Sequence, residues 1–475
     1  MSQRSEFHPT SPPSTSAYTG PERRAQSPLQ RLARQFDAAC TGAVDSLQVA
    51  AALESGGITD RIARDEYGFP DVFSLAEELY RRVPRRLKPK MARDGSSGRW
   101  RTLRELSHGP LFVLPALAYP ALSLTLGVWG LLVGLVLSTA VGWAWGLALS
   151  WLAYRQIGRG LREEAARLLA RLSLLGVLVV AALALPLVHL LGVNPQVVFL
   201  ATGQMAYQMA ASVLLIYGLE LWLLLGLLPG VLVNGWYLLV GLPQASRELA
   251  LGATLSALFL VLMAAGYALA KTPRSSRYTP TLKPGDFRAA LPFLLYGALS
   301  AALVLLGTAR YMLSGLDRSL SLLPLILCMG VLEWQARRFR EGSVEILRRT
   351  RRMSEFVLGE RRVLLQTLGT ALLAVGLASV AAGLGLAWLG QLTPEGVTML
   401  MAHLALAGAF FINFLLLARG RTAWVLLSVG GGLLLYGSLI WLFPPALSYL
   451  LSTLALFGAV LWGLRVSLGE VAQYR

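Results

Sequence analysis

Five polar side chains interrupt the long apolar stretches of this sequence, and they are the residues best placed to bind a polar ligand there. They are Gln204, Gln208, Asn234, His403 and Asn413. Gln204 and Gln208 are four residues apart, so on a helix they share one face. A polar group inside a membrane either lines a hydrated path or makes a hydrogen bond between helices. The sequence leaves both interpretations open for each of the five.

Charged residues outside the apolar stretches form two further candidate groups. Arg310, Asp317 and Arg318 flank a connection that we expect on the outer side of the membrane. There they either mark the ends of membrane segments or attract an anionic substrate at an outer mouth. The second group lies in a long basic connection and consists of Arg348, Arg349, Arg351 and Arg352. Clustered arginines at the cytoplasmic face fix orientation and bind anionic lipid, and we expect that role here.

Patterns that would support catalysis or a metal centre are missing from the sequence. It contains no Walker motif and no HExxH. The expected outer connections offer few carboxylates for a glycosyltransferase metal or base, namely Glu248, Asp317 and Glu395. Cys40 and Cys328 stand in no CxxC or Cys/His cluster. We therefore expect a protein that is not an enzyme and that binds no cofactor or metal.

The apolar stretches themselves make up most of the chain. Of its 475 residues, 55% are hydrophobic and 15% are charged, whereas soluble proteins have about 25% charged residues. Dividing the apolar region at its charged residues, with about 20 residues for each membrane helix, predicts twelve spans. They are expected at 110–129, 131–154, 172–192, 200–219, 221–242, 249–270, 289–309, 319–336, 363–391, 397–418, 422–443 and 446–464. The predicted fold class is an all-α polytopic membrane protein.

The positive charge predicts how these spans are oriented. Nearly all Lys and Arg between the spans fall in alternate connections, so those connections are expected in the cytoplasm together with both termini. The exception is the short connection at Glu220, which has no basic residue. The net charge of +17 is thus explained by orientation and contact with anionic membrane lipid, and no nucleic acid partner is expected. The expected location is the bacterial cytoplasmic membrane.

The sequence also indicates an internal duplication. The pattern Leu-x-Trp-x-Ala occurs at the end of the second span, from Leu149, and again in the eighth, from Leu332. A long basic helix is expected after each, and the first span of each half has a proline, Pro110 or Pro292. We predict two six-helix pseudo-repeats around a central cavity. The bundles are expected at residues 109–270 and 289–465, with a basic linker at 271–288 and a cytoplasmic tail at 466–475.

The region before the first span has a different character. Residues 1–26 are rich in Ser, Pro and Thr and are predicted to be disordered. Residues 27–108 are predicted to form a small cytoplasmic helical region. Its helices are expected from Pro28 to about Glu54, from Asp60 to Gly68, and from Asp71 to about Pro84. This region is either a cap on the inner face or a docking site for a cytoplasmic glycosyltransferase, and the cap is favoured.

These features resemble the polysaccharide exporters of the multidrug/oligosaccharidyl-lipid/polysaccharide flippase superfamily. The resemblance covers roughly residues 109–465 and rests on the two halves, the basic helices after spans two and eight, and the segment "KTPRSSRYTPTLKPGDFRAALPFLLYGALS" before the seventh span. It implies alternating access that moves a saccharide or lipid-linked saccharide outward. The chief alternative is a non-transporting scaffold or assembly subunit for envelope synthesis. A major-facilitator transporter is a third possibility, although its long inner loop would lie between the halves.

Overall fold

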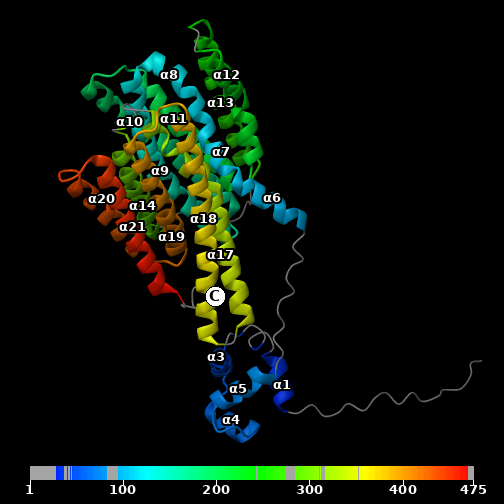
Figure 1. Ribbon diagram of the computed structural model, residues 1–475. Helices are drawn as coiled ribbons and strands as arrows, with labels where there is room; N and C mark the ends of the chain where they lie inside the picture. Colours follow the sequence, from blue (N-terminus) through cyan, green and yellow to red (C-terminus); the bar gives the residue numbers. More distant parts are fainter. Residues whose placement is uncertain are drawn as a thin grey trace, which may run out of the picture. The chain divides into compact units, whose positions relative to one another are not determined.

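The computed structural model describes residues 28–36, 40, 43, 45–82, 95–241, 244–272, 284–309, 311, 316–350 and 352–468. The chain divides into two compact units, Met1–Ala92 and Arg93–Arg475 (Figure 1). The sequence had placed this boundary later, after His108. The predicted tail at 1–26 and residues 273–283 of the predicted linker lie outside the described residues, as do residues 469–475.

The N-terminal unit is a small helical bundle with a core of its own. Its helices are α1 (Pro28–Gln35), α3 (Ser46–Ser55), α4 (Asp60–Tyr67) and α5 (Val72–Arg82). The core is formed by apolar side chains from all four helices, among them Leu32, Val49, Ala63, Leu75 and Leu79. The helices at 60–67 and 72–82 were predicted from the sequence.

The predicted single helix from Pro28 to Glu54 is wrong. The described residues of this range include two separate helices, α1 and α3, and α3 is capped by Asp45, whose carboxylate accepts a hydrogen bond from the amide of Gln48 at 2.9 Å. Aspartate is a preferred N-cap because its side chain satisfies an amide that has no partner in the first turn. The local cap therefore overrides the apolar pattern that continues through this region.

The second unit is all helical within its described residues, and it contains twelve helical segments that are long and apolar enough to cross a membrane. The predicted number of spans is therefore confirmed. The elements are α6 Gly95–Leu106, α7 His108–Val113, η1 Leu114–Ala118, α8 Tyr119–Leu126, α9 Val128–Gly158, α10 Arg162–Leu191, α11 Val197–Ile216, α12 Glu220–Leu239, α13 Gln244–Ala270, α14 Pro284–Thr308, α15 Leu316–Leu320, α16 Leu323–Leu327, α17 Met329–Arg349, α18 Met353–Trp388, α19 Pro394–Ala418, α20 Thr422–Leu439 and α21 Pro445–Ser467.

Two of the twelve spans are interrupted helices. The first span runs through α6, α7, the 3₁₀ helix η1 and α8, and it contains prolines at the starts of η1 and α8. The eighth span runs through α15, α16 and α17. Pro110 and Pro292 are not structurally equivalent, since Pro292 lies inside the continuous helix α14. Interrupted helices are tolerated in a membrane where neighbouring protein satisfies the backbone, and these two spans pack against each other.

The two predicted basic helices differ from expectation. In the first half the basic segment is the opening part of α10, which continues into the third span without a break. In the second half it divides at Thr350 between the end of α17 and the start of α18. These two helices run side by side as a long hairpin (Figure 1). Both connections are therefore helical extensions of membrane spans, and neither is a separate surface helix.

Packing between helices repeats in the two halves, which we define as α6–α13 and α14–α21. In the first half α9, α10 and α11 pack on one another, α13 packs on α11 and α12, and α12 packs on η1. In the second half α17, α18 and α19 pack on one another, α21 packs on α19 and α20, and α20 packs on α14. The same order of neighbours in both halves is the pattern expected of a six-helix pseudo-repeat.

The two copies of the Leu-x-Trp-x-Ala pattern also lie at equivalent places in the two halves. In the first half the guanidinium of Arg155 lies 5.0 Å from the ring centre of Trp151. In the second half Arg338 lies 5.2 Å from the ring of Trp334. Each pair is a cation–π contact between residues four apart on a helix. The short sequence match therefore marks corresponding points of the two halves.

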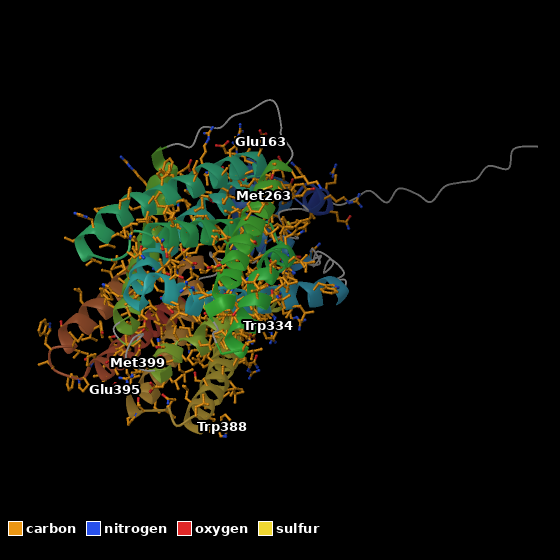
Figure 2. The ribbon with its side chains drawn as sticks, turned by 90° about the horizontal axis from the view of Figure 1, so that it is seen from above. Glu163, Met263, Trp334, Trp388, Glu395 and Met399 are labelled. Carbon is orange, nitrogen blue, oxygen red and sulfur yellow. The ribbon has the colours of Figure 1, made fainter. Side chains whose placement is uncertain are left out.

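The halves meet along two symmetric contacts, because α9 packs on α14 while α6 and α7 pack on α16 and α17. Glycine allows the backbones to approach closely at both. A Cβ at Gly297 would lie 2.7 Å from the Cα of Ala144, and one at Gly109 would lie 1.9 Å from the carbonyl oxygen of Leu327. Figure 2 shows Glu163 and Met263 of the first half on one side of the bundle, and Trp388, Glu395 and Met399 of the second on the other.

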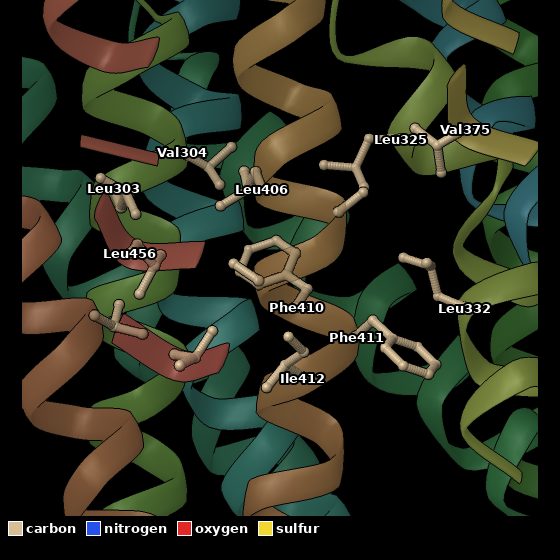
Figure 3. Packing of buried hydrophobic residues seen from close by; sticks show 14 of the residues in the cluster. Leu303, Val304, Leu325, Leu332, Val375, Leu406, Phe410, Phe411, Ile412 and Leu456 are labelled. Atoms are coloured by element: carbon tan, nitrogen blue, oxygen red, sulfur yellow. The ribbon is translucent and has the colours of Figure 1, made fainter. Parts of the chain in front are cut away.

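Each half has its own apolar core. The second half is organised around α19, and 78% of the apolar stretch of this helix is buried. Figure 3 shows Phe411 of this helix directed toward Leu332, while Phe410 points to the side that carries Leu456. The first core is built mainly from α9, α10 and α11. Separate cores are what two bodies need if they are to move as units.

Candidate functional site

A cavity of about 410 Å³ lies inside the first half, between the first span and helices α11, α12 and α13. The sequence predicted a central cavity between the two halves, whereas this cavity lies within one half. Its lining includes two of the five predicted polar residues, Gln204 and Asn234. Its rim includes Phe199 and Leu255, which are 78% and 67% exposed. Exposed apolar side chains on a membrane span face lipid, so the cavity reaches the lipid-facing surface.

Several residues that line this cavity have polar side chains, and two of their polar atoms are buried without a partner in the described part of the chain. The amide nitrogen of Asn234 donates to the carbonyl oxygen of Gly230 at 2.8 Å and to the hydroxyl of Thr254 at 3.0 Å. Its Oδ1 atom has no hydrogen-bond partner within the described part of the chain, and neither has the hydroxyl of Tyr207. Buried polar atoms of this kind favour a ligand that can hydrogen-bond to them. Asn234 therefore joins two helices through its nitrogen, while its oxygen is buried beside the cavity without a partner in the described part of the chain.

No charged side chain belongs to the lining of this cavity among the residues that the structure describes. Its polar members are Tyr119, Thr125, Gln196, Gln204, Tyr207, Asn234 and Thr254, and the others are apolar or glycine. Such a lining can hydrogen-bond to hydroxyl or amide groups and can pack against aliphatic chains, but it provides no counter-ion for a phosphate.

The other three predicted polar residues lie elsewhere. Gln208 packs against α9, where a Cβ at Gly142 would come within 1.7 Å of its Oε1. His403 and Asn413 are fully buried in α19, within the second half. His403 lies edge-on to Tyr449, with ring centroids 5.6 Å apart. The structure thus brings Gln204 and Asn234 together at one cavity and does not gather all five residues.

The predicted outer-mouth residues make contacts within the second half. Asp317 is buried and accepts hydrogen bonds from the amide and the hydroxyl of Thr393, at 3.1 and 2.5 Å. Arg318 pairs with Glu395 at 2.6 Å. These contacts tie α15 to the start of α19, which is a structural role. Arg310 lies outside the described residues.

Three of the four predicted lipid-contact arginines lie in the α17–α18 hairpin. Arg348, Arg349 and Arg352 are exposed, and Arg349 pairs with Glu345 on the same helix at 2.6 Å. Arg351 lies outside the described residues. Their exposure allows contact with anionic lipid.

A charged cluster that the sequence did not predict occupies the end of the bundle where odd-numbered spans begin, which we call the basic end. At its centre is His108, at the start of α7. The Nδ1 atom lies 2.6 Å from Glu333 Oε2 of the second half, and Nε2 lies 3.4 Å from Glu220 Oε1 of the first. Arg104 also pairs with Glu220, at 3.1 Å. One imidazole therefore contacts a carboxylate from each half.

Two further ion pairs at the basic end also cross between the halves. The Nε atom of Arg337 lies 2.7 Å from Glu105 Oε1, and its Nη2 lies 2.7 Å from Oε2. At the symmetric contact, Arg155 of α9 lies 3.3 Å from Asp286 of α14. In each case the carboxylate is near the start of the first span of one half, and the arginine is at the end of the second span of the other.

The sequence interpretation of these charges is therefore corrected. Their spacing of four residues on one helix would pair Glu333 with Arg337, but the structure pairs Glu333 with His108, and Arg337 with Glu105 and Glu341. The sequence marked Glu220 only as the position of the connection that departs from the charge rule. The signal that could have revealed its role was the absence of a basic residue in its own connection, since Arg104 and His108 supply the positive charge from another span.

Comparisons with known proteins give a likeness of architecture. No family model matches the sequence, and no match is found among curated proteins. An inward-facing multidrug resistance MATE family transporter of the MOP superfamily aligns with 78% of this chain and 98% of its own, at 14% identity and a TM-score of 0.44. A MATE structure in the bent conformation aligns with 79% and 93%, at 15% identity and 0.41. At this identity and score the likeness extends to the helical arrangement alone.

Proposed function

We propose that this chain is a membrane transporter that moves an amphipathic, saccharide-bearing lipid by alternate opening of its two halves. The observation that carries the proposal is the cavity in the first half, because it combines hydrogen-bonding groups inside with a rim that faces lipid. An amphiphile can enter such a site sideways, with its apolar chain remaining among the lipids. Transport by this route is not an enzymatic reaction.

The cavity's chemistry supports an uncharged polar group as the part that enters. A sugar removed from water needs replacement hydrogen bonds, and Gln204, Asn234 and Tyr207 can provide them. The volume of about 410 Å³ is typical of a small-molecule site, so it favours a short saccharide over a long polymer. A charged phosphate would have to remain at the rim, since the described lining contains no cation.

The cellular setting follows from charge. With arginines concentrated at the basic end, this end is proposed to face the cytoplasm of a bacterial cell, with both termini on that side. The N-terminal unit is then a cap on the inner face or a docking site for a glycosyltransferase that makes the substrate. Deleting the gene should lower a surface polysaccharide while its lipid-linked precursor accumulates.

The test is lipid movement by the full-length protein reconstituted in vesicles. Two fluorescent lipids are compared, a neutral glucosylceramide and an anionic phosphatidylglycerol, and dithionite reports the fraction in the outer leaflet. We expect faster exchange of the glucosylceramide between leaflets. Gln204→Leu with Asn234→Leu should slow it about tenfold or more, because each lost hydrogen bond to a buried group costs roughly 1–3 kcal/mol.

Two further variants make this test specific. Tyr207→Phe removes a hydroxyl without a partner in the described chain, so it should slow exchange without lowering protein abundance. Gln366→Leu, on an exposed position of α18, is the matched control and should have no effect. Exchange of both lipids at the rate of protein-free vesicles would contradict the proposal.

The alternative function, a non-transporting scaffold for envelope synthesis, is favoured by one observation. The close backbone contacts at Gly297 and Gly109 pack the halves tightly against each other. A scaffold would keep this arrangement permanently, whereas a transporter must separate the halves at one end during each cycle.

A further inference from the structure

His108 lies where the halves meet at the basic end, and it is mostly buried there. Its side chain is 14% exposed, and those of Glu220 and Glu333 are 7% and 36% exposed. Glu220 belongs to the first half and Glu333 to the second. The imidazole therefore joins a buried carboxylate of the first half, Glu220, to a partly exposed carboxylate of the second, Glu333.

The protonation state of an imidazole decides how many such bonds it can donate. An imidazolium carries a proton on both nitrogens and can donate to Glu333 and Glu220 at once. A neutral imidazole donates from one nitrogen and presents a lone pair at the other, which would face a carboxylate oxygen. Loss of the proton therefore removes one of the two bonds and places two electron-rich atoms against each other.

The surrounding charges also favour an added positive charge. Around His108, α6 contributes Arg104 and Glu105, α12 contributes Glu220, and α17 contributes Glu333 and Arg337. Tyr154 of α9 is the nearby phenol, and α16 contributes no charged side chain. Three carboxylates thus face two guanidiniums, and an imidazolium makes the group neutral. Arg101 and Glu341, which join this network at its edge, cancel each other.

We propose that His108, Glu220 and Glu333 form a proton-binding site that holds the two halves together at the basic end, and that release of the proton allows them to separate there. The ion pairs Glu105–Arg337 and Asp286–Arg155 close the same end without a proton. The ligand is a proton taken from the solution at this end. This inference deepens the proposed function, since it names the ion that would couple to movement of the halves.

The test is the distance between spin labels on the two halves, measured on the full chain in lipid vesicles as a function of pH. Labels are placed at Gly158→Cys of α9 and Arg340→Cys of α17, both exposed positions near the basic end. Cys40 and Cys328 are replaced by Ser. Because one proton is bound in the closed state, the ratio of closed to open protein should fall by up to about tenfold for each unit by which the pH rises. The change should be centred at the pH where the site titrates, and the ordinary pKa of histidine is about 6.5.

Four variants separate this site from a general effect of pH. His108→Gln cannot be protonated, so its distance distribution should not change between about pH 5 and pH 8. His108→Lys carries a permanent charge and should stay closed over the same range. His189→Gln, an exposed histidine of α10, is the matched control and should behave as the unmodified chain does. Glu333→Gln, a milder change, should reduce the pH response at least several-fold.

A distribution in the unmodified chain that does not respond to pH would overturn the proposal, as would an unchanged response in His108→Gln or Glu333→Gln. The outcome is separate from that of lipid transport. A pH-dependent distance in a protein that moves no lipid would leave the proton site in place and reject the transporter. Lipid movement with a distance that ignores pH would reject the proton site alone.

Discussion

The bidentate ion pair between Arg337 and Glu105 should contribute measurably to stability, and its size can be estimated from its burial. The two side chains are 18% and 15% exposed and share charge-assisted hydrogen bonds of 2.7 Å. Hydrogen bonds to charged groups contribute about 1.5–3 kcal/mol. After Arg337→Gln, Arg101 still lies 3.4 Å from Glu105, but it is 57% exposed and replaces little of the loss. We expect this variant to lower the free energy of unfolding by about 2 kcal/mol.

The assay is reversible unfolding of the purified protein in mixed micelles, followed by tryptophan fluorescence as sodium dodecyl sulfate is added. Arg349→Gln is the matched control, because its pair with Glu345 is 71% and 39% exposed. Exposed pairs contribute less than about 1 kcal/mol, so this control should change little. Equal effects of Arg337→Gln and Arg349→Gln would refute the reasoning.

Three further predictions concern other parts of the chain. Gly297→Leu should lower the free energy of unfolding by about 1–3 kcal/mol in the same assay, because a Cβ there meets the α9 backbone, while Gly252→Leu, at a position with nothing within 4 Å, should be neutral. Cysteine labelling in cells should place Arg159 and Arg349 in the cytoplasm and Gln391 outside, and finding Arg349 outside would overturn the twelve-span topology. Residues 27–92 should fold alone and melt at lower temperature in acid, as circular dichroism would show. The Ser74 amide lowers the pKa of Asp71, and Arg82 lowers that of Glu78. Both carboxylates thus stabilise the fold above their ordinary pKa values, 3.8 and 4.5, and this is lost as pH falls below them. An unchanged melting temperature from pH 7 to about pH 3 would contradict it.

Features encoded by local composition could be predicted from the sequence. Twelve spans follow from the spacing of charged residues, because a charge inside the apolar part of a membrane is costly. The duplication was indicated by the pattern around Trp151 and Trp334, which the structure places at corresponding points. Gln204 and Asn234 were selected as polar residues within spans, and both line the cavity.

Features that depend on which helices face each other could not be predicted. His108 and Glu333 are far apart in the sequence, and nothing near either residue identifies the other as its partner. Asp317 was selected for its charge, but its partner is Thr393, a residue on a different helix. Gln208 shares a helical face with Gln204, yet the close approach of Gly142 places it against α9. In each case the deciding information is the packing of helices that are distant in the chain.

The central claim is that the two halves move relative to each other, and reciprocal distances at the two ends test it most directly. A second pair of spin labels is placed at the opposite end of the bundle, at Leu190→Cys and Gln391→Cys, both exposed. This pair and the pair at Gly158 and Arg340 are measured under the same conditions in lipid vesicles. The account predicts that conditions which lengthen the basic-end distance shorten the opposite one. A single, unchanging distribution at both ends would contradict it and identify the chain as a rigid scaffold.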